Sequence, residues 1–327
     1  MLEIVLIAAA GLLSWSLTGL LRRALGADGP TAAVTPRSLH VAPVARGGGL
    51  AILATVLLLW PLWSPAAFIG HGALVAGLGL LAVVSWLDDR RGLGVAVRLL
   101  VQALVIAIVL AGLDASRRLA PVLPLLAERA LIALGWLWFV NLFNFMDGID
   151  GLACVETIAV ALGSVAVSAL AATNGDLAAP ALLLAAATAG FLYWNWAPAR
   201  IFLGDTGSIP IGFLLGWMLL ELAFSGLWAP ALLLPLYFAA DATWTLAARV
   251  SRREMPWQPH REHFYQRAAL AGRTHAAVVR MVGGADLALI VAALIAVRIP
   301  WLGLAIGSAA VGRLLWALHA PRADSAS

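Results

Sequence analysis

The sequence predicts an all-α, polytopic integral membrane protein. Of its 327 residues, 62% are hydrophobic and only 12% are charged, a composition that excludes an ordinary soluble globular protein. Apolar stretches of about 20 residues, the length that a helix needs to cross a bilayer, recur along the chain between polar loops. No internal repeat and no soluble domain interrupts this pattern, so we expect a single transmembrane domain over residues 1–327.

We predict about eleven transmembrane helices, with ten as the lower count. The first apolar stretch contains Glu3 and lacks a basic leader, so we interpret it as a span and not as a cleaved signal. The predicted spans cover residues 2–21, 47–64, 68–87, 95–113, 128–146, 154–172, 179–197, 207–224, 229–248, 281–297 and 301–318.

The distribution of arginine predicts the orientation of these spans. All 21 basic residues are Arg; 17 of them fall on one side of the predicted spans and the remaining 4 on the other. Because basic residues are retained on the cytoplasmic side, we expect the N-terminus outside. The same rule explains the net charge of +4 without a nucleic-acid partner. The predicted cytoplasmic loops are about 22–46, 88–94, 147–153, 198–206 and 249–280.

The stretch from Asn141 to Leu152 places oxygen-rich side chains at the cytoplasmic end of the fifth span. Its polar members are spaced by three and are Asn141, Asn144, Asp147 and Asp150. This spacing keeps successive members on one arc of a helix. Such oxygens beside glycines suit Mg²⁺ and a phosphate that shares it. The alternative is a capped helix end, but four such groups on a membrane helix are costly and favour a functional site.

Two further motifs lie at cytoplasmic span ends. Asp88 and Asp89 are adjacent, so on a helix they point about 100° apart; one could bind metal or accept a proton while the other pairs with Arg, and an acidic helix end neutralised by Arg is the alternative. Asp205 lies between two glycines at the start of the eighth span, where backbone N–H groups favour phosphate. Phe202, two residues earlier, could stack on a base. An N-cap within 204–208 is compatible with either role.

The segment after the ninth span offers cations and hydrogen-bond donors for a diphosphate or a sugar. These are His260, Arg261 and His263. The two His could also suggest a metal, but no Cys and no third close His supports zinc, and an ordinary basic loop remains an alternative. Arg46 precedes three glycines, which suit close helix packing or a phosphate loop.

Taken together, the motifs resemble the polyprenyl-phosphate N-acetylhexosamine-1-phosphate transferases, glycosyltransferase family 4. The resemblance runs from Arg37 to Arg267, and the loop at 260–266 looks like the branch that initiates O-antigen in lipopolysaccharide biosynthesis. The clustered His loop of the muramoyl-pentapeptide enzyme is missing from the sequence.

The resemblance implies a reaction in which undecaprenyl phosphate attacks the β-phosphorus of a UDP-N-acetylhexosamine. UMP leaves, and a lipid-linked sugar diphosphate remains to start a cell-envelope glycan. It further implies Mg²⁺ (with Mn²⁺ as a substitute), a bacterial plasma (inner) membrane location and an active site on the cytoplasmic face, and it leaves a homodimer open.

The resemblance also implies roles for individual residues. The metal is assigned to Asn144 and Asp205; uracil to Asp150 and Phe202; the lipid phosphate to Asp88 and Asp89; the sugar diphosphate to His260, Arg261 and His263. Asp147 joins the catalytic candidates, and Asn141 and Arg46 join the substrate-binding ones. The rival class is a transporter or flippase for an anionic lipid, which would place its polar groups near the bilayer midplane on repeated halves. A structural scaffold leaves the motifs unexplained.

Overall fold

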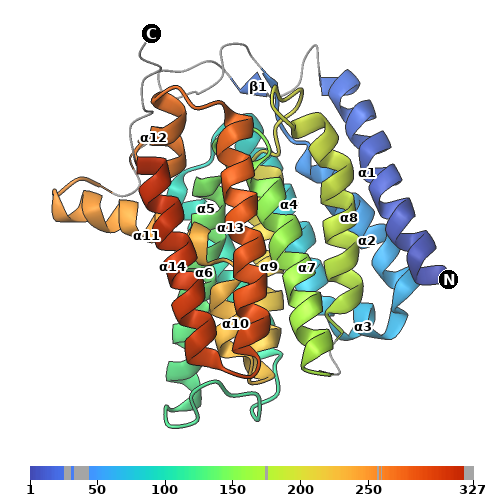
Figure 1. The fold of residues 1–327 in the computed structure, drawn as a ribbon. Helices are drawn as coiled ribbons and strands as arrows, with labels where there is room; N and C mark the ends of the chain where they lie inside the picture. The colour runs from blue at the N-terminus through green and yellow to red at the C-terminus, as the bar shows by residue number, and fades with distance from the viewer. Residues whose placement is uncertain (26–30, 33–43, 174–175, 256–257, 259, 320–327) are drawn as a thin grey trace.

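The computed structural model describes residues 1–25, 31–32, 44–173, 176–255, 258 and 260–319. Within these residues the protein is a bundle of helices (Figure 1), joined by one pair of two-residue antiparallel strands, β1 (Thr31–Ala32) and β2 (Val44–Ala45). Most of the predicted loop 22–46, including Arg37, lies outside the described residues. The helices are α1 (Leu2–Leu25), α2 (Gly49–Trp63), α3 (Pro65–Gly70), α4 (Gly72–Arg91), α5 (Val95–Ala111), α6 (Leu125–Met146), α7 (Leu152–Leu170), α8 (Ala178–Asn195), α9 (Asp205–Phe224), α10 (Trp228–Leu233), α11 (Leu236–Ser251), α12 (Phe264–Leu270), α13 (His275–Ala296) and α14 (Pro300–His319).

The all-α, polytopic membrane class is confirmed, although the count of eleven spans is not. Among the described residues, eight helices are long and apolar enough to cross a membrane, namely α1, α4, α6, α7, α8, α9, α13 and α14. The apolar helices α2 and α5 have only 15 and 17 residues. At 1.5 Å per residue they reach about 22–26 Å, short of a hydrocarbon core of about 30 Å.

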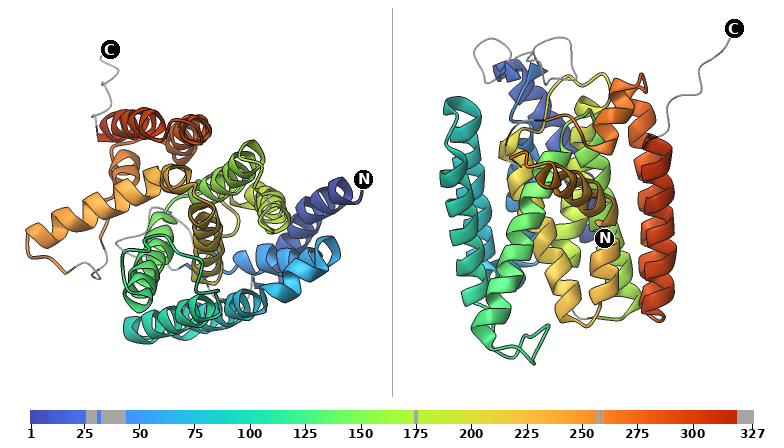
Figure 2. Two further views of the ribbon diagram at one scale, coloured as in Figure 1. Left: turned by 90° about the horizontal axis from the view of Figure 1, so that it is seen from below. Right: turned by 90° about the vertical axis from the view of Figure 1, so that its left-hand side faces the viewer.

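The prediction of one continuous span over 229–248 is wrong. The chain forms the short α10, stops at Pro235, and continues as α11, which projects sideways from the bundle (Figures 1 and 2). Proline lacks the N–H that a continuous helix would need at this position and its ring clashes with the preceding turn. Elsewhere helices begin or end outside the predicted spans: α1 and α4 extend to Leu25 and Arg91, and α13 begins at His275.

Helix α9 forms the core of the bundle. It runs between α4, α6, α2, α7 and α10 and lies near the middle of the view from below (Figure 2). Every residue from Thr206 to Leu219 is buried. Because the other helices pack around it, the position of the α9 N-terminus fixes where their polar ends meet.

We predict that the 249–280 segment is cytoplasmic and that the 114–127 loop is outside, because the arginines are biased toward the first. Ser251 and Ser116 are both exposed, and the native Cys154 is buried. A membrane-impermeant maleimide should therefore label Ser116→Cys in intact cells, and Ser251→Cys only after permeabilisation. Labelling of Ser251→Cys from outside would contradict the orientation.

Candidate active site

Arg98 lies at the centre of the polar end of the bundle, one turn into α5. Its NH1 group donates to Asp88 Oδ2 at 2.8 Å and to Asp205 Oδ2 at 2.9 Å. Asp88 Oδ1 also accepts from the amide of Leu93 at 2.6 Å. One guanidinium on α5 therefore joins α4 and α9. It brings together two carboxylates that are 117 residues apart in the sequence.

Asp89 supplies the cap of α9. Its Oδ2 accepts from the backbone N of Thr206 at 3.1 Å and from the Thr206 hydroxyl at 2.6 Å. Gly204 precedes the helix at φ +75°, and a Cβ there would lie 2.9 Å from Asp89 Oδ2. The cap thus comes from α4 and not from within 204–208. The carboxylate of Asp205, whose side chain is 27% exposed, stays available beside Arg98.

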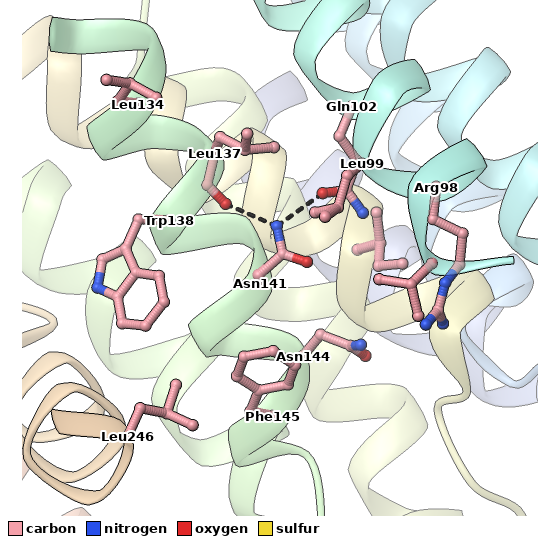
Figure 3. Close-up of a pocket in the computed structure, with 12 residues that line it drawn as sticks. Arg98, Leu99, Gln102, Leu134, Leu137, Trp138, Asn141, Asn144, Phe145 and Leu246 are labelled. Carbon is pink, nitrogen blue, oxygen red and sulfur yellow. Dashed lines mark hydrogen bonds between the residues drawn. The ribbon is translucent and has the colours of Figure 1, made fainter. Parts of the chain in front are cut away.

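The stretch from Asn141 to Leu152, called the acidic stretch below, contains two amides that face different partners. Asn141 Nδ2 donates to Gln102 Oε1 and to the carbonyl of Leu137, both at 2.8 Å (Figure 3). Asn144 Oδ1 accepts from the Ser208 hydroxyl at 2.6 Å. The C-terminal end of α6 is therefore tied to α5 through Asn141 and to α9 through Asn144.

The two carboxylates of the same stretch lie beyond the end of α6. Burial raises the pKa of the Asp147 carboxyl to about 7, and the charge of Asp205 adds to the rise. The guanidinium of the exposed Arg46 acts in the opposite direction. Asp150 Oδ2 accepts from the amide of Ala199 at 3.0 Å and lies 3.3 Å from His275 Nδ1, at the start of α13.

The three glycines after Arg46 serve close packing. The amide of Gly48 donates to the carbonyl of Phe202 at 3.0 Å, and the amide of Phe202 donates to the carbonyl of Ala45 at 2.8 Å. A Cβ on Gly49 would lie 2.0 Å from Gly207 Cα. The segment before α2 therefore pairs with the segment before α9, which places Phe202 near Arg46.

The segment from His260 to His263, called the basic loop below, is held by hydrogen bonds within it and to α11. His263 is buried, with Nδ1 3.1 Å from Asp241 Oδ1 on α11. His260 Nδ1 accepts from the amide of Glu262 at 3.4 Å. Burial lowers the pKa of His260 to about 4, with nearby His263 and Arg249 acting in the same direction, so this imidazole is neutral near pH 7.

An apolar pocket of about 360 Å³ opens beside Arg98 and the two amides of α6 (Figure 3). Its polar members, Arg98, Gln102, Asn141 and Asn144, are accompanied by the apolar Val95, Leu99, Leu134, Leu137, Trp138, Phe145, Ile209 and Leu246. Leu134 and Trp138 are exposed, so the pocket is open to the surface of the bundle.

Arg98, Gln102 and His275 are not among the candidates that the sequence motifs indicate, yet all three hydrogen-bond or ion-pair with residues that are. The signal for Arg98 was present, because a charge one turn into an apolar helix is costly and needs a partner. Nothing in the sequence indicated which carboxylates would provide that partner.

The site gathers more acidic than basic charge. Asp147 is influenced by Asp205, Asp89 and Asp150, with Arg46 as the opposing cation. Within the described part of the chain, no three His, Cys, Asp or Glu side chains converge as a set that could hold a metal. The arrangement instead offers single carboxylate and amide oxygens around Arg98.

Sequence comparisons with known proteins cover the residues that form this polar end. The sequence model of the family described as "Glycosyl transferase family 4" matches residues 71–223. This range includes Asp88, Asp89, the acidic stretch and Asp205.

Three relatives illustrate the similarity. A probable undecaprenyl-phosphate N-acetylglucosaminyl 1-phosphate transferase of Bacillus subtilis (strain 168) is 29% identical over 261 residues, covering 73% of this chain and 69% of the relative. A decaprenyl-phosphate N-acetylglucosaminephosphotransferase of Mycolicibacterium smegmatis is 29% identical over 315 residues, covering 84% and 77%. A phospho-N-acetylmuramoyl-pentapeptide-transferase of Mycobacterium sp. (strain JLS) is 33% identical over 217 residues, covering 50% and 60%. The chain is therefore similar to the glycosyl transferase family 4 model over residues 71–223 and to polyprenyl-phosphate sugar-phosphate transferases over a larger part of its length.

We predict that Gly49→Ala destabilises the protein. The added Cβ meets backbone atoms of Gly207 that cannot rotate away, and overpacking of this kind costs about 1–3 kcal/mol or more. The midpoint of thermal unfolding in detergent should fall. Gly79→Ala in α4 is the matched control, because its Cβ meets nothing within 4 Å, and an equal fall in both variants would contradict the packing argument.

Proposed function

We propose that this protein transfers an N-acetylhexosamine-1-phosphate from a UDP-sugar to undecaprenyl phosphate, at the cytoplasmic face of a bacterial plasma membrane. The observation that carries the proposal is Arg98, which bridges Asp88 and Asp205 and also lines the apolar pocket. A cation at the boundary between an apolar pocket and a carboxylate cluster could hold a lipid phosphate against a second phosphate.

The acceptor fits the apolar pocket. Its lining of Leu, Val and Trp side chains suits an isoprenoid chain, and Arg98 and Gln102 at its polar side suit the terminal phosphate. An oxygen of the lipid phosphate forms a bond to the β-phosphorus of the donor, and the bond from that phosphorus to the oxygen bridging toward the α-phosphate breaks. UMP leaves with that oxygen. A phosphate monoester is largely ionised near pH 7, so it can attack without a general base.

The donor fits the side of the site formed by Asp150, Phe202 and the basic loop. Asp150, held by His275 and the amide of Ala199, presents a carboxylate that can accept from the uracil N3–H. Phe202 is assigned to stacking on the base. His260, neutral near pH 7 and accepting at Nδ1, would donate one hydrogen bond from Nε2 to the sugar diphosphate, and Arg261 would supply the positive charge.

We propose that a magnesium ion binds with the donor, with Mn²⁺ as a substitute. Mg²⁺ is usually bound by one or two carboxylates together with substrate phosphates, not by an all-protein cage. This fits the described part of the chain, where no three His, Cys, Asp or Glu side chains converge. Asp205 and Asn144 would hold it, one on α9 and one on α6. When bound it neutralises charge on the diphosphate. Arg98 keeps Asp205 in place while that site is formed.

The donor sugar is proposed as an N-acetylhexosamine of the GlcNAc, FucNAc or QuiNAc type, for a lipid-linked cell-envelope glycan. Two of the relatives are named for N-acetylglucosamine, which puts UDP-GlcNAc first. The loop at His260–Gln266 supports the O-antigen type, and the missing His cluster argues against the muramoyl-pentapeptide donor.

A reconstitution with the purified chain, Mg²⁺ and undecaprenyl phosphate tests the reaction. Each UDP-N-acetylhexosamine is supplied with ³²P at the β-phosphate, and we expect the label in the lipid fraction together with one UMP per label transferred. UDP-MurNAc-pentapeptide serves as the comparison donor. Absence of lipid-linked label from every donor, or uptake of an anionic lipid into vesicles without UMP release, would contradict the proposal and favour a transporter.

We predict that Asp205→Asn abolishes turnover without preventing folding, because it removes charge from a partly exposed oxygen and leaves volume unchanged. The wild-type enzyme should lose activity with EDTA and regain it with Mg²⁺ or Mn²⁺. The assay above measures both, and Asp114→Asn in the outer loop is the matched control. Full activity in chelator would remove Asp205 and Asn144 from their proposed role together.

We predict that the two substrates respond to different substitutions. Leu134→Trp would fill the pocket and raise KM for the lipid, with little effect on the UDP-sugar; Leu131→Trp on the same helix is the control, because Leu131 is exposed but does not line the pocket. Phe202→Ala should weaken UDP-sugar use by about 5- to 150-fold, the effect of losing one stacked base. Steady-state kinetics with each substrate varied in turn decide it, and a reversed pattern would contradict both assignments.

A further inference from the structure

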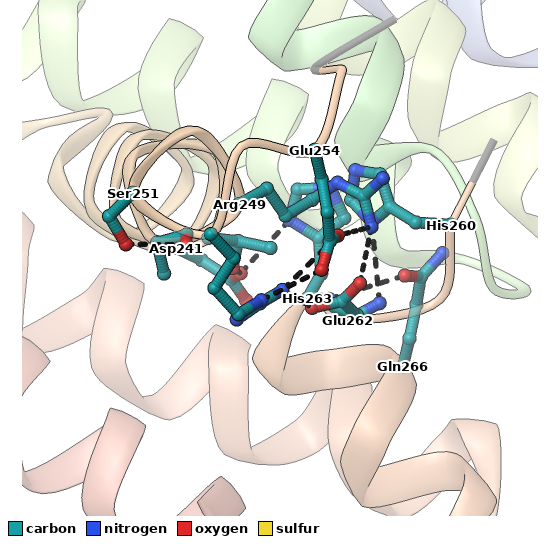
Figure 4. A network of polar contacts seen from close by, with 11 residues as sticks. Asp241, Arg249, Ser251, Glu254, His260, Glu262, His263 and Gln266 are labelled. Carbon is teal, nitrogen blue, oxygen red and sulfur yellow. Dashed lines mark hydrogen bonds and ion pairs between the residues drawn. The ribbon is translucent and has the colours of Figure 1, made fainter. Parts of the chain in front are cut away.

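Asp241, on α11, is fully buried and receives five hydrogen bonds. Its oxygens accept from Tyr237 Oη at 3.2 Å and Thr245 Oγ1 at 3.3 Å on its own helix, and lie 3.1 Å from His263 Nδ1. The amides of Phe264 and Tyr265 donate to it at 3.1 and 3.4 Å. This carboxylate therefore holds both the basic loop and the first turn of α12 (Figure 4).

The other side of the basic loop is held by ion pairs. Glu262 contacts both Arg249 and Arg252, and Arg249 also lies 2.9 Å from Glu254. Figure 4 shows Arg249, Glu254 and Glu262 close to His260 and His263, with Asp241 on the neighbouring helix α11. The loop is thus fixed at two points, of which only Asp241 is fully buried.

Tyr265 carries this restraint to the acidic stretch. Its ring is fully buried, and its hydroxyl donates to the carbonyl of Phe145 at 3.0 Å. A Cβ built on Gly148 would lie 2.1 Å from the Tyr265 hydroxyl oxygen. The tyrosine therefore rests on the backbone of Gly148, the residue between Asp147 and Ile149, at a distance that only glycine allows.

We propose that Asp241 is a positioning residue for the transfer reaction. Through His263 and Tyr265 it sets the basic loop, assigned to the sugar diphosphate, against the acidic stretch, assigned to metal and uracil. The inference rests on the proposed function and names a residue that touches neither substrate. A buried carboxylate is costly unless every oxygen is satisfied, and two of its donors here are backbone amides in the first turn of α12, directly after the loop. Packing alone would be served as well by an apolar side chain.

The first test is Asp241→Asn, measured as kcat and KM for each substrate per folded protein. The substitution keeps the shape but replaces one acceptor oxygen with an NH2 group that faces donors. We expect kcat/KM for the UDP-sugar to fall by about 10- to 100-fold, as for a small misplacement of reacting groups, while KM for the lipid phosphate changes little. Asp241→Glu, which retains the acceptor oxygens, should recover part of the loss. Asp114→Asn, the same change in the outer loop, should match wild type.

The second test does not require Asp241 variants to fold. Gly148→Ala should lower kcat/KM for the UDP-sugar strongly, because its Cβ collides with the tyrosine hydroxyl. Adding Tyr265→Phe removes that oxygen and leaves ring carbons at 3.0 and 3.2 Å, so the double variant should recover part of the lost activity. Gly135→Ala in α6, with nothing within 4 Å of its Cβ, is the control.

The outcomes are distinct. A purely structural role would lower the yield and thermal midpoint of Asp241→Asn but leave kcat/KM per folded protein unchanged. That result, or strictly additive effects in the Gly148 and Tyr265 cycle, would overturn the inference. A wild-type protein without transferase activity would instead overturn the proposed function.

Discussion

The ion pairing of Arg98 with Asp88 and Asp205 is the interaction on which the polar end of the bundle depends. Carboxylates from α4 and α9 repel one another at close range, and burial among helices strengthens that repulsion. Removing one partner from a buried charge pair typically costs about 3–5 kcal/mol. The Arg98 side chain is 27% exposed, so water screens part of this effect.

Close backbone approach at Gly49 and Gly207 makes the rest of the arrangement possible. The contact lets the segment before α2 pair with the segment before α9, and so sets the α9 N-terminus at the depth where Asp89 caps it. The same cap leaves Asp205 beside Arg98. The contact between Gly49 and Gly207 therefore determines the packing of α2 on α9, the capping of α9 by Asp89 and the position of Asp205 beside Arg98.

Much of the helical architecture could be predicted from the sequence, because lipid solvation imposes long apolar helices. The gathering of Asp88, Asn144 and Asp205 at one end follows from their place at helix ends. The break at Pro235 was also visible in the sequence, but a hydropathy window averages over the prolines that cause it.

The partners of individual side chains could not be predicted in the same way. Arg98 as a bridge, Asp89 as the cap of α9 and His263 as a buried partner of Asp241 all depend on contacts between helices distant in sequence. The spacing of residues within a helix defines which face they share, but not which neighbouring helix that face meets.

The central claim is that Asp205 and its neighbours assemble a metal–diphosphate site when the nucleotide sugar binds. The most direct measurement is ³¹P electron–nuclear double resonance on the purified protein loaded with Mn²⁺ and UDP-GlcNAc. The account predicts ³¹P couplings from phosphate oxygens bound directly to a protein-held Mn²⁺, and the loss of that protein-bound signal in Asp205→Asn. A protein-bound Mn²⁺ with no ³¹P coupling, or an unchanged signal in Asp205→Asn, would contradict it.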